Sequence, residues 1–323
     1  KKTIISNQVD FKEVRGQAKA KRALEIAAAG GHNLMMVGPP GTGKTMLAER
    51  VPSILPPLNR AEKLATIKIL SMHGLMHKVD VHSHERPFRA PHHTASYAGL
   101  IGGGMHTPRL GEVSLAHNGV LFLDEVAEFR KDVLEALRQP LESGDVHVVR
   151  ANGSYTYPAR FLLIASMNPC KCGFYNHPRR PCICTIPQVQ NYQRKISGPL
   201  SDRIDLHLQI EPVPHHILLE TAPTEDSFSI RTRVLAARQL QLQRSSKNNA
   251  LLSYEQLKKH CALDLRAEKL LYDAMEKMYL SARAVHRILK VTRTIADLDG
   301  AQAVSAKHFA EALTYRPMEM PIS

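Results

Sequence analysis

One eight-residue segment limits the folds open to this chain more than any other feature. Gly38–Thr45 reads GPPGTGKT, follows the short apolar run Asn33–Val37 and precedes a helical pattern at Met46–Val51. A strand, a glycine-rich loop and a helix in that order form a phosphate-binding loop. Glycines let backbone N–H groups turn inward, and the helix N-terminus adds a positive dipole. The segment therefore predicts an α/β fold with a site for nucleotide phosphates.

Within this loop, each polar side chain has an expected task. We expect Lys44 to reach the β- and γ-phosphates and Thr45 to bind Mg²⁺. An ordinary glycine-rich turn is the alternative, but the flanking strand and helix disfavour it. The residues that we expect around the nucleotide are Gly38, Pro39, Pro40, Gly41, Thr42, Gly43, Lys44 and Thr45.

A second motif, Leu121–Glu125 (LFLDE), ends an apolar strand in two acids. Open α/β sheets bind ligands at the carboxyl ends of their strands, which is where these acids would lie. We expect Asp124 to hold the Mg²⁺ ion, directly or through water, and Glu125 to orient and deprotonate an attacking water. Alone, the motif would describe a strand ending in a solvated acid pair. Beside the glycine loop, two acids favour hydrolysis over simple nucleotide binding.

Apolar strands alternate with helical segments through the first two thirds of the chain, and the remainder reads as helical. This alternation predicts a parallel sheet covered by helices on both faces. The predicted parts are an α/β core at 1–212, an irregular insertion within it at about 72–110, a β-hairpin at about 146–157, a cysteine-rich loop at 170–184, a linker at 213–229 and an all-helical lid domain at 230–323.

The chain is strongly and unevenly basic. It holds 43 Lys and Arg against 30 Asp and Glu, a formal net charge of +13. Between Glu142 and Asp202 there are seven bases and one acid, a local net charge of +6. Such an excess points to a polyanion, most often nucleic acid, while a solvated basic surface or a subunit contact is the alternative. The candidate phosphate contacts are Arg150, Lys171, Arg179 and Arg180.

Other classes of protein are disfavoured. The longest apolar runs, such as Phe161–Ala165, are too short to span a bilayer, and the first ten residues lack the apolar core of a signal peptide. Five cysteines are too few for a disulfide scaffold at this length. We therefore expect a cytoplasmic protein with no membrane partner.

Four of the cysteines form two C-x-C pairs separated by nine residues rich in Gly, Pro and Arg. Four thiolates in such a group predict a tetrahedral, structural Zn²⁺ site that would hold an otherwise loose loop. His177 is a candidate replacement for one ligand. Free thiols, or disulfides formed on oxidation, are the alternatives. The four predicted ligands are Cys170, Cys172, Cys182 and Cys184; Cys261 stands apart.

Longer phrases resemble AAA+ ATPases of the magnesium-chelatase-like branch and, within it, the ComM/YifB family. They are Phe88–Thr94 (FRAPHHT), Gly111–Glu125 (GEVSLAHNGVLFLDE) and Ser197–Leu206 (SGPLSDRIDL), and the resemblance runs through nearly the whole chain. It implies an AAA+ core with a helical lid, ATP and ADP as ligands, and a hexameric ring. Members of the family are bacterial helicases that drive DNA branch migration during natural transformation. The resemblance therefore implies ATP-driven translocation on single-stranded or branched DNA in homologous recombination.

The resemblance also assigns roles to residues of the subunit that binds the nucleotide. Val14–Gln17, including Gly16 and Gln17, resembles the segment that lies against adenine in AAA+ proteins. Asn168, which follows the strand Phe161–Ala165, resembles the sensor-1 residue that polarises water near the γ-phosphate. The alternative for Asn168 is an Asn-Pro turn.

Two arginines resemble catalytic arginines of the same proteins. Arg203 resembles the arginine finger that one subunit supplies to its neighbour's ATP; an intramolecular pair with Asp202 or Asp205 is the alternative. Arg283 resembles the sensor-2 arginine of the helical lid, and Arg287, one turn later, is the competing candidate. A finger that acts between subunits requires an oligomer, because a monomer cannot complete the site.

One departure concerns length. ComM/YifB proteins carry a Lon-like domain before the ATPase, and this chain begins almost at the AAA+ boundary, so we expect it to lack that domain. A second function is a magnesium-chelatase-type remodeller that acts on a protein partner with the same ATPase. The basic segment and the cysteines favour DNA. A non-hydrolysing switch conflicts with the joint presence of Glu125, Asn168 and Arg203.

Overall fold

The structure is a computed structural model. The predictions that fall outside its described residues are Ser197–Pro199 of the third family phrase, the side chain of Arg150, and parts of the predicted insertion, linker and lid. The residues that it describes are 9–72, 74–75, 83–103, 109–150, 153–196, 200–214, 216–217 and 224–317.

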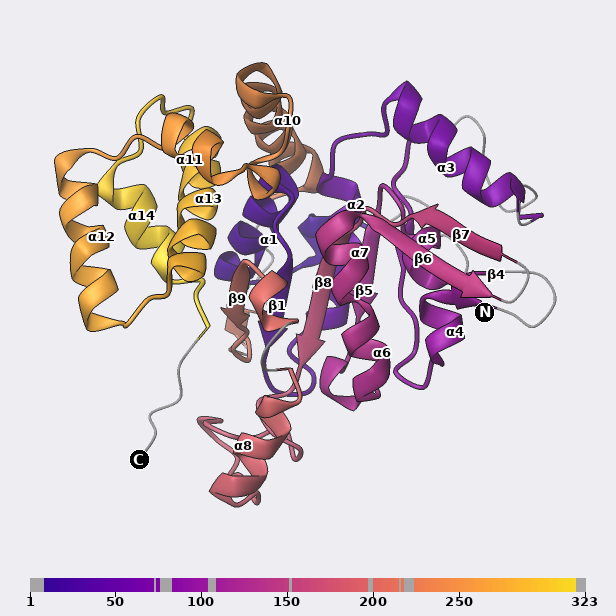
Figure 1. The fold of residues 1–323 in the computed structure, drawn as a ribbon. Coiled ribbons are helices and arrows are strands. Elements are labelled where there is room, and N and C mark those ends of the chain that lie inside the picture. The colour runs from indigo at the N-terminus through magenta and orange to yellow at the C-terminus, as the bar shows by residue number, and fades with distance from the viewer. Residues whose placement is uncertain are drawn as a thin grey trace.

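A parallel five-stranded sheet forms the centre of the molecule (Figure 1). Its strand order is β2-β5-β8-β1-β9, so the strand before the glycine loop lies between β8 and β9. A parallel sheet is buried on both faces, which explains why its three inner strands, β5, β8 and β1, are largely apolar. The strands are β1 (Leu34–Val37), β2 (Phe88–Arg89), β5 (Val120–Leu123), β8 (Leu162–Met167) and β9 (Leu206–Gln209).

Shorter strands and helices complete the described part of the chain. The strands outside the main sheet are β3 (Gly102–Gly103), β4 (Arg109–Leu110), β6 (Asp145–Arg150) and β7 (Gly153–Pro158). The helices are α1 (Ala18–Gly30), α2 (Lys44–Ile54), α3 (Arg60–Met72), α4 (Tyr97–Leu100), α5 (Glu112–Leu115), α6 (Lys131–Ala136), α7 (Arg138–Ser143), α8 (Ile186–Arg194), α10 (Ser227–Ser245), α11 (Tyr254–His260), α12 (Leu265–Lys277), α13 (Ala282–Leu298) and α14 (Ala306–Leu313), with short 3-10 helices η1 (Phe11–Glu13), η3 (Val126–Glu128), η4 (Ser201–Arg203) and η5 (Asn249–Leu251).

Side chains alternate between two apolar layers along the inner strands β1, β5 and β8. Met36 and Phe122 belong to the layer that includes α1, α2 and α10, whereas Met35, Leu121 and Leu163 belong to the layer that includes α4, α5 and α6. The predicted fold, a parallel sheet flanked by helices and followed by a helical region, is confirmed. Within the described residues, no helix has both the length and the apolar content needed to cross a bilayer.

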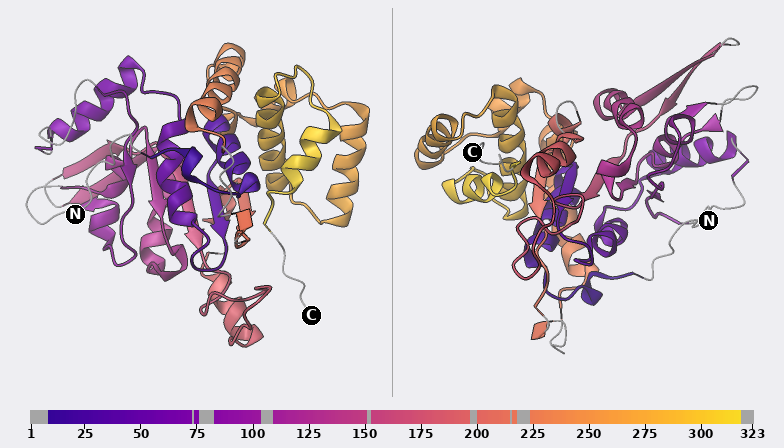
Figure 2. Two further views of the ribbon diagram at one scale, coloured as in Figure 1. Left: turned by 180° about the vertical axis from the view of Figure 1, so that it is seen from behind. Right: turned by 90° about the horizontal axis from the view of Figure 1, so that it is seen from below.

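The hairpin of β6 and β7 pairs Asp145 with Pro158 at its base and Arg150 with Gly153 near its tip. It projects away from the main sheet (Figure 2, right). The predicted insertion is more regular than expected, because Phe88–Arg89 pairs with Val120 and Leu121 as the edge strand β2. Close approach explains this: a Cβ on Gly119 would lie 2.0 Å from the Pro87 carbonyl oxygen.

The helices from Ser227 onwards fall into two groups. Helix α10 packs against α1 and α2, whereas α11 to α14 form a group beside β9 that is joined to α1 and α10 through α13 (Figures 1 and 2). That group meets the sheet where the His207 N–H donates to the Tyr315 carbonyl, at 2.6 Å. The fully buried His32 adds a second link, with Nδ1 2.8 Å from Asp205 Oδ2 and Nε2 2.7 Å from Thr294 Oγ1.

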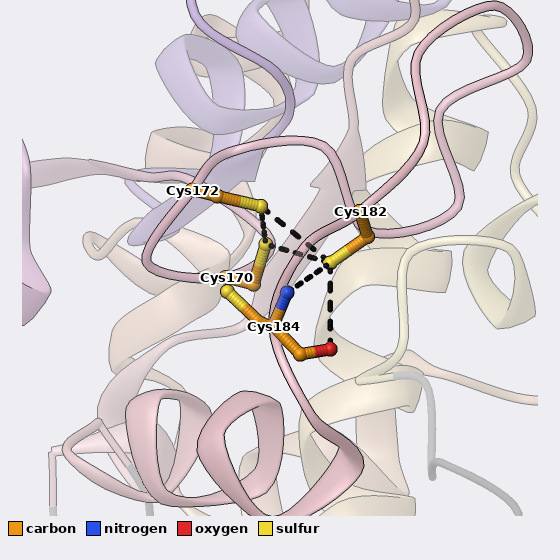
Figure 3. A group of neighbouring side chains, drawn as sticks. All are labelled: Cys170, Cys172, Cys182 and Cys184. Carbon is orange, nitrogen blue, oxygen red and sulfur yellow. Dashed lines mark hydrogen bonds between the residues drawn. The ribbon is translucent and has the colours of Figure 1, made fainter.

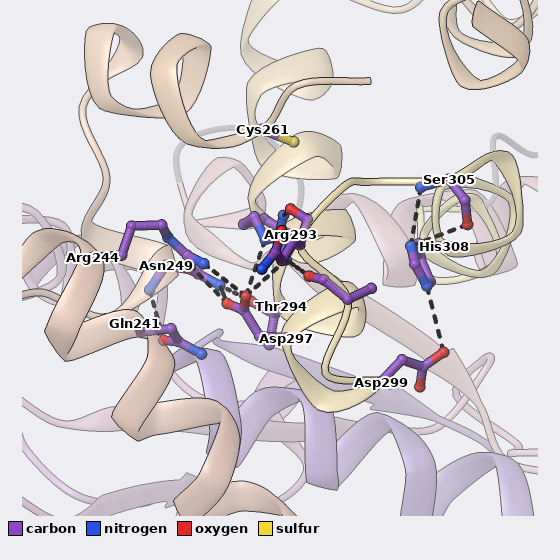
Figure 4. Close-up of polar contacts among 12 residues, drawn as sticks. Gln241, Arg244, Asn249, Cys261, Arg293, Thr294, Asp297, Asp299, Ser305 and His308 are labelled. Carbon is purple, nitrogen blue, oxygen red and sulfur yellow. Dashed lines mark hydrogen bonds and ion pairs between the residues drawn. The ribbon is translucent and has the colours of Figure 1, made fainter. Parts of the chain in front are cut away.

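A buried ionic network stabilises this helical group (Figure 4). The Asp297 carboxylate accepts from Arg244 Nη2 at 2.7 Å, Arg293 Nε at 3.0 Å and Asn249 Nδ2 at 2.8 Å. Asp297 and Arg293 are almost fully buried. Buried charge is tolerated only when it is paired and hydrogen-bonded, and here the carboxylate has both kinds of partner.

Candidate nucleotide site

The glycine-rich loop joins the carboxyl end of β1 to the first residue of α2. Gly43 caps α2 in the left-handed region, with φ +84°, and a Cβ there would meet no atom within 4 Å. The opposite holds at Gly38, where a Cβ would lie 2.4 Å from the Ile210 carbonyl oxygen. Glycine is therefore required at Gly38 for close packing and at Gly43 for conformation, and the space beside Gly43 is open to a ligand.

The Lys44 side chain turns back onto the phosphate-binding loop and lies next to Asn168, the predicted sensor residue. Its ammonium donates to the carbonyls of Gly38 at 2.7 Å and Pro39 at 2.9 Å, and to Asn168 Oδ1 at 3.3 Å. Burial lowers the pKa of Lys44, while the carboxylates of Asp124 and Glu125 act in the opposite direction. The ammonium is thus partly desolvated, which strengthens its attraction for an anion.

Asp124 is held by hydroxyl and backbone donors on both of its oxygens. Thr45 Oγ1 donates to Oδ2 at 2.7 Å, Ser166 Oγ donates to Oδ1, and the Glu125 N–H donates to Oδ1 at 3.1 Å. Carboxylate and hydroxyl oxygens are the protein ligands that Mg²⁺ prefers, together with water and phosphate oxygens. The donor set of Thr45 and Asp124 therefore fits a magnesium ion.

Glu125 differs from Asp124 in exposure and partners. Its backbone is left-handed, with φ +50°, and its side chain is 51% exposed. Nδ1 of His93 lies 3.7 Å from Glu125 Oε2. Sequence reasoning missed both His93 and Ser166. Ser166 had a usable signal, a polar residue directly after the apolar run Phe161–Ala165, whereas nothing in the sequence links His93 to Glu125.

The segment predicted to lie against adenine also reaches the loop. Gln17 Nε2 donates to the carbonyls of Glu211 at 2.9 Å and Thr42 at 3.4 Å. A Cβ on Gly16 would lie 3.0 Å from Val213 Cγ1. The start of α1, the phosphate loop and the residues after β9 are therefore in contact. The structure brings Gly16 and Gln17 together with the predicted phosphate residues.

Arg203 lies at the other edge of the sheet. Asn33, the residue before β1, donates from Nδ2 to the Arg203 carbonyl at 2.8 Å, whereas Lys44 follows the carboxyl end of β1. A strand rises about 3.3 Å per residue, so the length of β1 separates the two positions by roughly 13 Å. The Arg203 guanidinium pairs with Glu142, which was not among the intramolecular partners considered from the sequence, Asp202 and Asp205. Burial lowers the pKa of Arg203, and Arg138 and Arg283 lower it further.

The two candidate sensor-2 arginines lie beside Arg203 and differ in their contacts. Arg287 is 21% exposed and donates from Nη1 to the carbonyls of Ser201 at 3.0 Å and Ile204 at 3.2 Å. Arg283 is 85% exposed, and its Nη1 lies 3.9 Å from Asp202 Oδ2. Arg287 is thus engaged with its own chain, whereas Arg283 is open to solvent.

A cluster of sulfur atoms lies directly after the sensor residue (Figure 3). The ligand atoms of this group all lie within 4.8 Å of one another. His177 is not one of these residues, and its Nδ1 accepts from the backbone of Arg179 and Arg180 at 3.0 Å. The residues that we call the cysteine cluster are Cys170, Cys172, Cys182 and Cys184.

The candidate phosphate contacts are divided between two places. Lys171, Arg179 and Arg180 are exposed on the loop that carries the cysteine cluster, and the Arg180 guanidinium lies 5.3 Å from the centre of the Phe174 ring. Arg150 belongs to the distant β6–β7 hairpin. The four candidate phosphate contacts therefore do not form a single basic patch on one subunit.

Two family models match the chain. The model described as magnesium chelatase, subunit ChlI, matches residues 10–218, and the model described as the C-terminal part of that subunit matches residues 224–316. The first match covers the sheet and the candidate site, and the second covers the helical group. The family resemblance expected from the sequence is thereby confirmed.

Individual relatives agree with the family models. YifB of Salmonella typhimurium is 47% identical over 313 residues, which are 96% of this chain and 61% of YifB. The competence protein ComM of Haemophilus influenzae is 47% identical over 317 residues, 97% of this chain and 61% of ComM. Rv2897c of Mycobacterium tuberculosis is 41% identical over 320 residues, 97% of this chain and 63% of that protein. The chain thus spans about three fifths of these relatives.

Proposed function

The chain belongs to the magnesium chelatase subunit ChlI family of AAA+ ATPases, and on that premise we propose that it binds and hydrolyses ATP at the carboxyl edge of its sheet. One observation carries this proposal. Lys44 contacts Asn168, and Thr45 contacts Asp124, so residues from three separate segments converge on one site. Chance resemblance of short motifs would not require their side chains to meet.

Each residue of the site has a task in hydrolysis. Lys44 and the backbone N–H groups of the loop bind the phosphates, and Asn168 positions water near the γ-phosphate. Thr45 and Asp124 would hold Mg²⁺, which supplies positive charge to the phosphate oxygens when it is bound. Glu125 is exposed beside this group, and we propose that its carboxylate accepts the proton of the attacking water.

The finger assignment requires a second subunit. Arg203 lies at the opposite edge of the sheet from Lys44, so it cannot serve the ATP of its own chain. Its partner Glu142 is 62% exposed, so a neighbour's phosphate can approach the guanidinium from solvent and replace this carboxylate. We therefore propose that the active form is a homo-oligomer, in which a ring of six is the arrangement implied by the family resemblance.

We further propose that this ATPase is a DNA motor of the cytoplasm. The similar Haemophilus influenzae protein is named a competence protein. A helicase or translocase that promotes branch migration in homologous recombination during natural transformation fits that name and the net charge of +13. Exposed Lys171, Arg179 and Arg180 and the projecting hairpin are available for phosphate contacts, which would be salt-dependent and independent of sequence.

Steady-state ATP hydrolysis with and without a four-way DNA junction tests the proposal. We expect hydrolysis that the junction stimulates, that added salt weakens and that Lys44→Ala abolishes through loss of nucleotide binding. Arg179→Ala together with Arg180→Ala should reduce stimulation while basal hydrolysis stays unchanged. Absence of hydrolysis in every oligomeric state would contradict the ATPase assignment.

A protein remodeller of the chelatase type is the second candidate, because the matching family models describe a magnesium chelatase subunit. It would use the same site and the same finger, so only the partner differs. Robust hydrolysis that no DNA structure alters, at any salt concentration, would favour it over the motor.

A further inference from the structure

The loop between β8 and α8 has almost no apolar core. From Pro169 to Thr185, all of which the structure describes, only Cys170 and Gly173 are buried. The segment contains no helix or strand, and Ile183 is 85% exposed. Burial of apolar surface therefore cannot supply the ordering free energy that a loop of this length requires. A different constraint must hold its conformation.

Sulfur positions in the cysteine cluster indicate what that constraint is (Figure 3). Cys170 Sγ lies 3.3 Å from Cys172 Sγ and 3.7 Å from Cys182 Sγ, and the latter two are 3.5 Å apart. Four thiolates about 2.3 Å from a tetrahedral zinc ion are roughly 3.8 Å from one another, close to these separations. A disulfide needs its sulfurs at about 2.05 Å, and the cysteines are free.

We propose that the cysteine cluster binds one structural zinc ion and that this ion holds the loop against the phosphate-binding loop. Four protein thiolates fill a tetrahedral shell and leave no open position, so the ion has no place for a substrate. Zinc binding then supplies the ordering free energy that the loop lacks, as it does in small metal-stabilised domains.

Two features connect the cysteine cluster to the nucleotide site. Asn168, which accepts from Lys44, precedes the first ligand Cys170 by two residues. A Cβ on Gly173 would lie 2.6 Å from Pro40 Cδ, so the two loops touch with no room between them. A separate bond, from Gln193 Nε2 of α8 to the Pro169 carbonyl at 2.8 Å, ties the start of the loop to α8. The proposed effect of the zinc site on the phosphate-binding loop rests on the proposed ATPase function, because it assumes that this loop binds a nucleotide.

Metal analysis of the purified chain tests the zinc site independently of nucleotide binding. We expect about one zinc per chain and, after exchange, the visible spectrum of Co²⁺ bound by four thiolates. Cys172→Ser with Cys184→Ser should remove both signals. Cys261→Ser is the matched control, because Cys261 lies outside the cluster and should leave one zinc per chain. Protein that contains no zinc and takes up no Co²⁺ would overturn the proposal.

Calorimetric titration with ADP tests the contact between the loops. Gly173→Ala keeps all four ligands but pushes the added methyl group into Pro40, so we expect one zinc per chain and roughly tenfold weaker ADP binding. Gly300→Ala is the control, since Gly300 also has a positive φ, of +67°, but its Cβ would meet nothing within 4 Å. Equal ADP affinity in Gly173→Ala and Gly300→Ala would refute the contact while leaving zinc binding intact. Failure of the unaltered chain to bind ADP would instead contradict the proposed function.

Discussion

The two edges of the parallel sheet carry different kinds of charged group. At the carboxyl edge, Lys44 donates a hydrogen bond to Asn168, and Thr45 donates one to Asp124, all within one chain. At the amino edge, Arg203 and Arg283 lie together near Asp202, and Arg283 is 85% exposed. The first edge is a preorganised site, and the second exposes Arg283 to solvent with the mostly buried Arg203 near it.

This difference indicates how the molecule divides its work. A site that needs both edges cannot be completed by one chain, because β1 lies between Asn33, which contacts Arg203, and the phosphate loop. A neighbour that places its amino edge against this carboxyl edge would bring the arginines to the phosphates. Hydrolysis would then depend on the relative position of two subunits, which is how such motors couple chemistry to motion.

Removal of the cation at the amino edge should have the largest effect. Arg203→Ala should lower ATP turnover by about 10³–10⁵-fold, the range measured for arginine fingers, with little change in ADP affinity. Arg130→Ala is the control, since Arg130 is an exposed arginine paired with Asp132. Turnover and calorimetric binding measured on both variants check the prediction; loss of ADP binding in Arg203→Ala would place this arginine in its own chain's site.

At the carboxyl edge, loss of the proposed base should come next. Glu125→Gln should reduce turnover by about 10²–10⁴-fold while ATP binding persists, because the amide cannot take a proton from water. Glu128→Gln, three residues later, should leave turnover within a few-fold. Normal hydrolysis by Glu125→Gln in single-turnover measurements would exclude Glu125 as the base.

The helical group supports the amino edge, and its buried network should be sensitive to charge removal. Asp297→Ala leaves Arg244 and Arg293 without their shared carboxylate, so we expect a loss of about 3–5 kcal/mol in the free energy of unfolding. Asp299→Asn, which alters a partly exposed carboxylate in the same group, should cost about 1 kcal/mol or less. Urea unfolding of both variants measures the difference. Equal losses in the free energy of unfolding would show that the buried network stabilises the chain no more than the partly exposed Asp299 carboxylate does.

Substitution of the two candidate sensor-2 arginines should have different effects, one mainly on ATP turnover and the other mainly on stability. Arg283→Ala should lower turnover by about tenfold without changing the melting temperature, because Arg283 has only a long contact with Asp202. Arg287→Ala should mainly lower the melting temperature, since it removes two hydrogen bonds to η4. The reverse pattern would make Arg287 the sensor-2 residue.

Much of the carboxyl edge could be predicted from the sequence. The loop Gly38–Thr45 and the motif Leu121–Glu125 are local, and parallel strands bring their carboxyl ends together. The contacts of Ser166 with Asp124 and of His93 with Glu125 were missed, because they depend on packing between segments far apart in the chain.

The amino edge was harder to predict. The sequence offered Asp202 and Asp205 as partners for Arg203, since they are its neighbours in the chain, and gave no sign that α7 brings Glu142 to it. The edge strand β2 was also missed, because two residues are too few to show strand periodicity. What failed in both cases was reasoning from sequence proximity, where tertiary packing decides.

Mixing two inactive variants tests the division of the site between subunits most directly. Arg203→Ala retains Glu125, and Glu125→Gln retains Arg203. A junction is therefore complete when the Glu125→Gln subunit supplies its arginine to the nucleotide of an Arg203→Ala subunit. In randomly mixed rings about a quarter of the sites would be complete, and turnover should recover towards that fraction of the unaltered protein. Recovery that scales with the proportion of mixed oligomers is the predicted result. Mixed oligomers that stay as inactive as either variant alone would contradict the account.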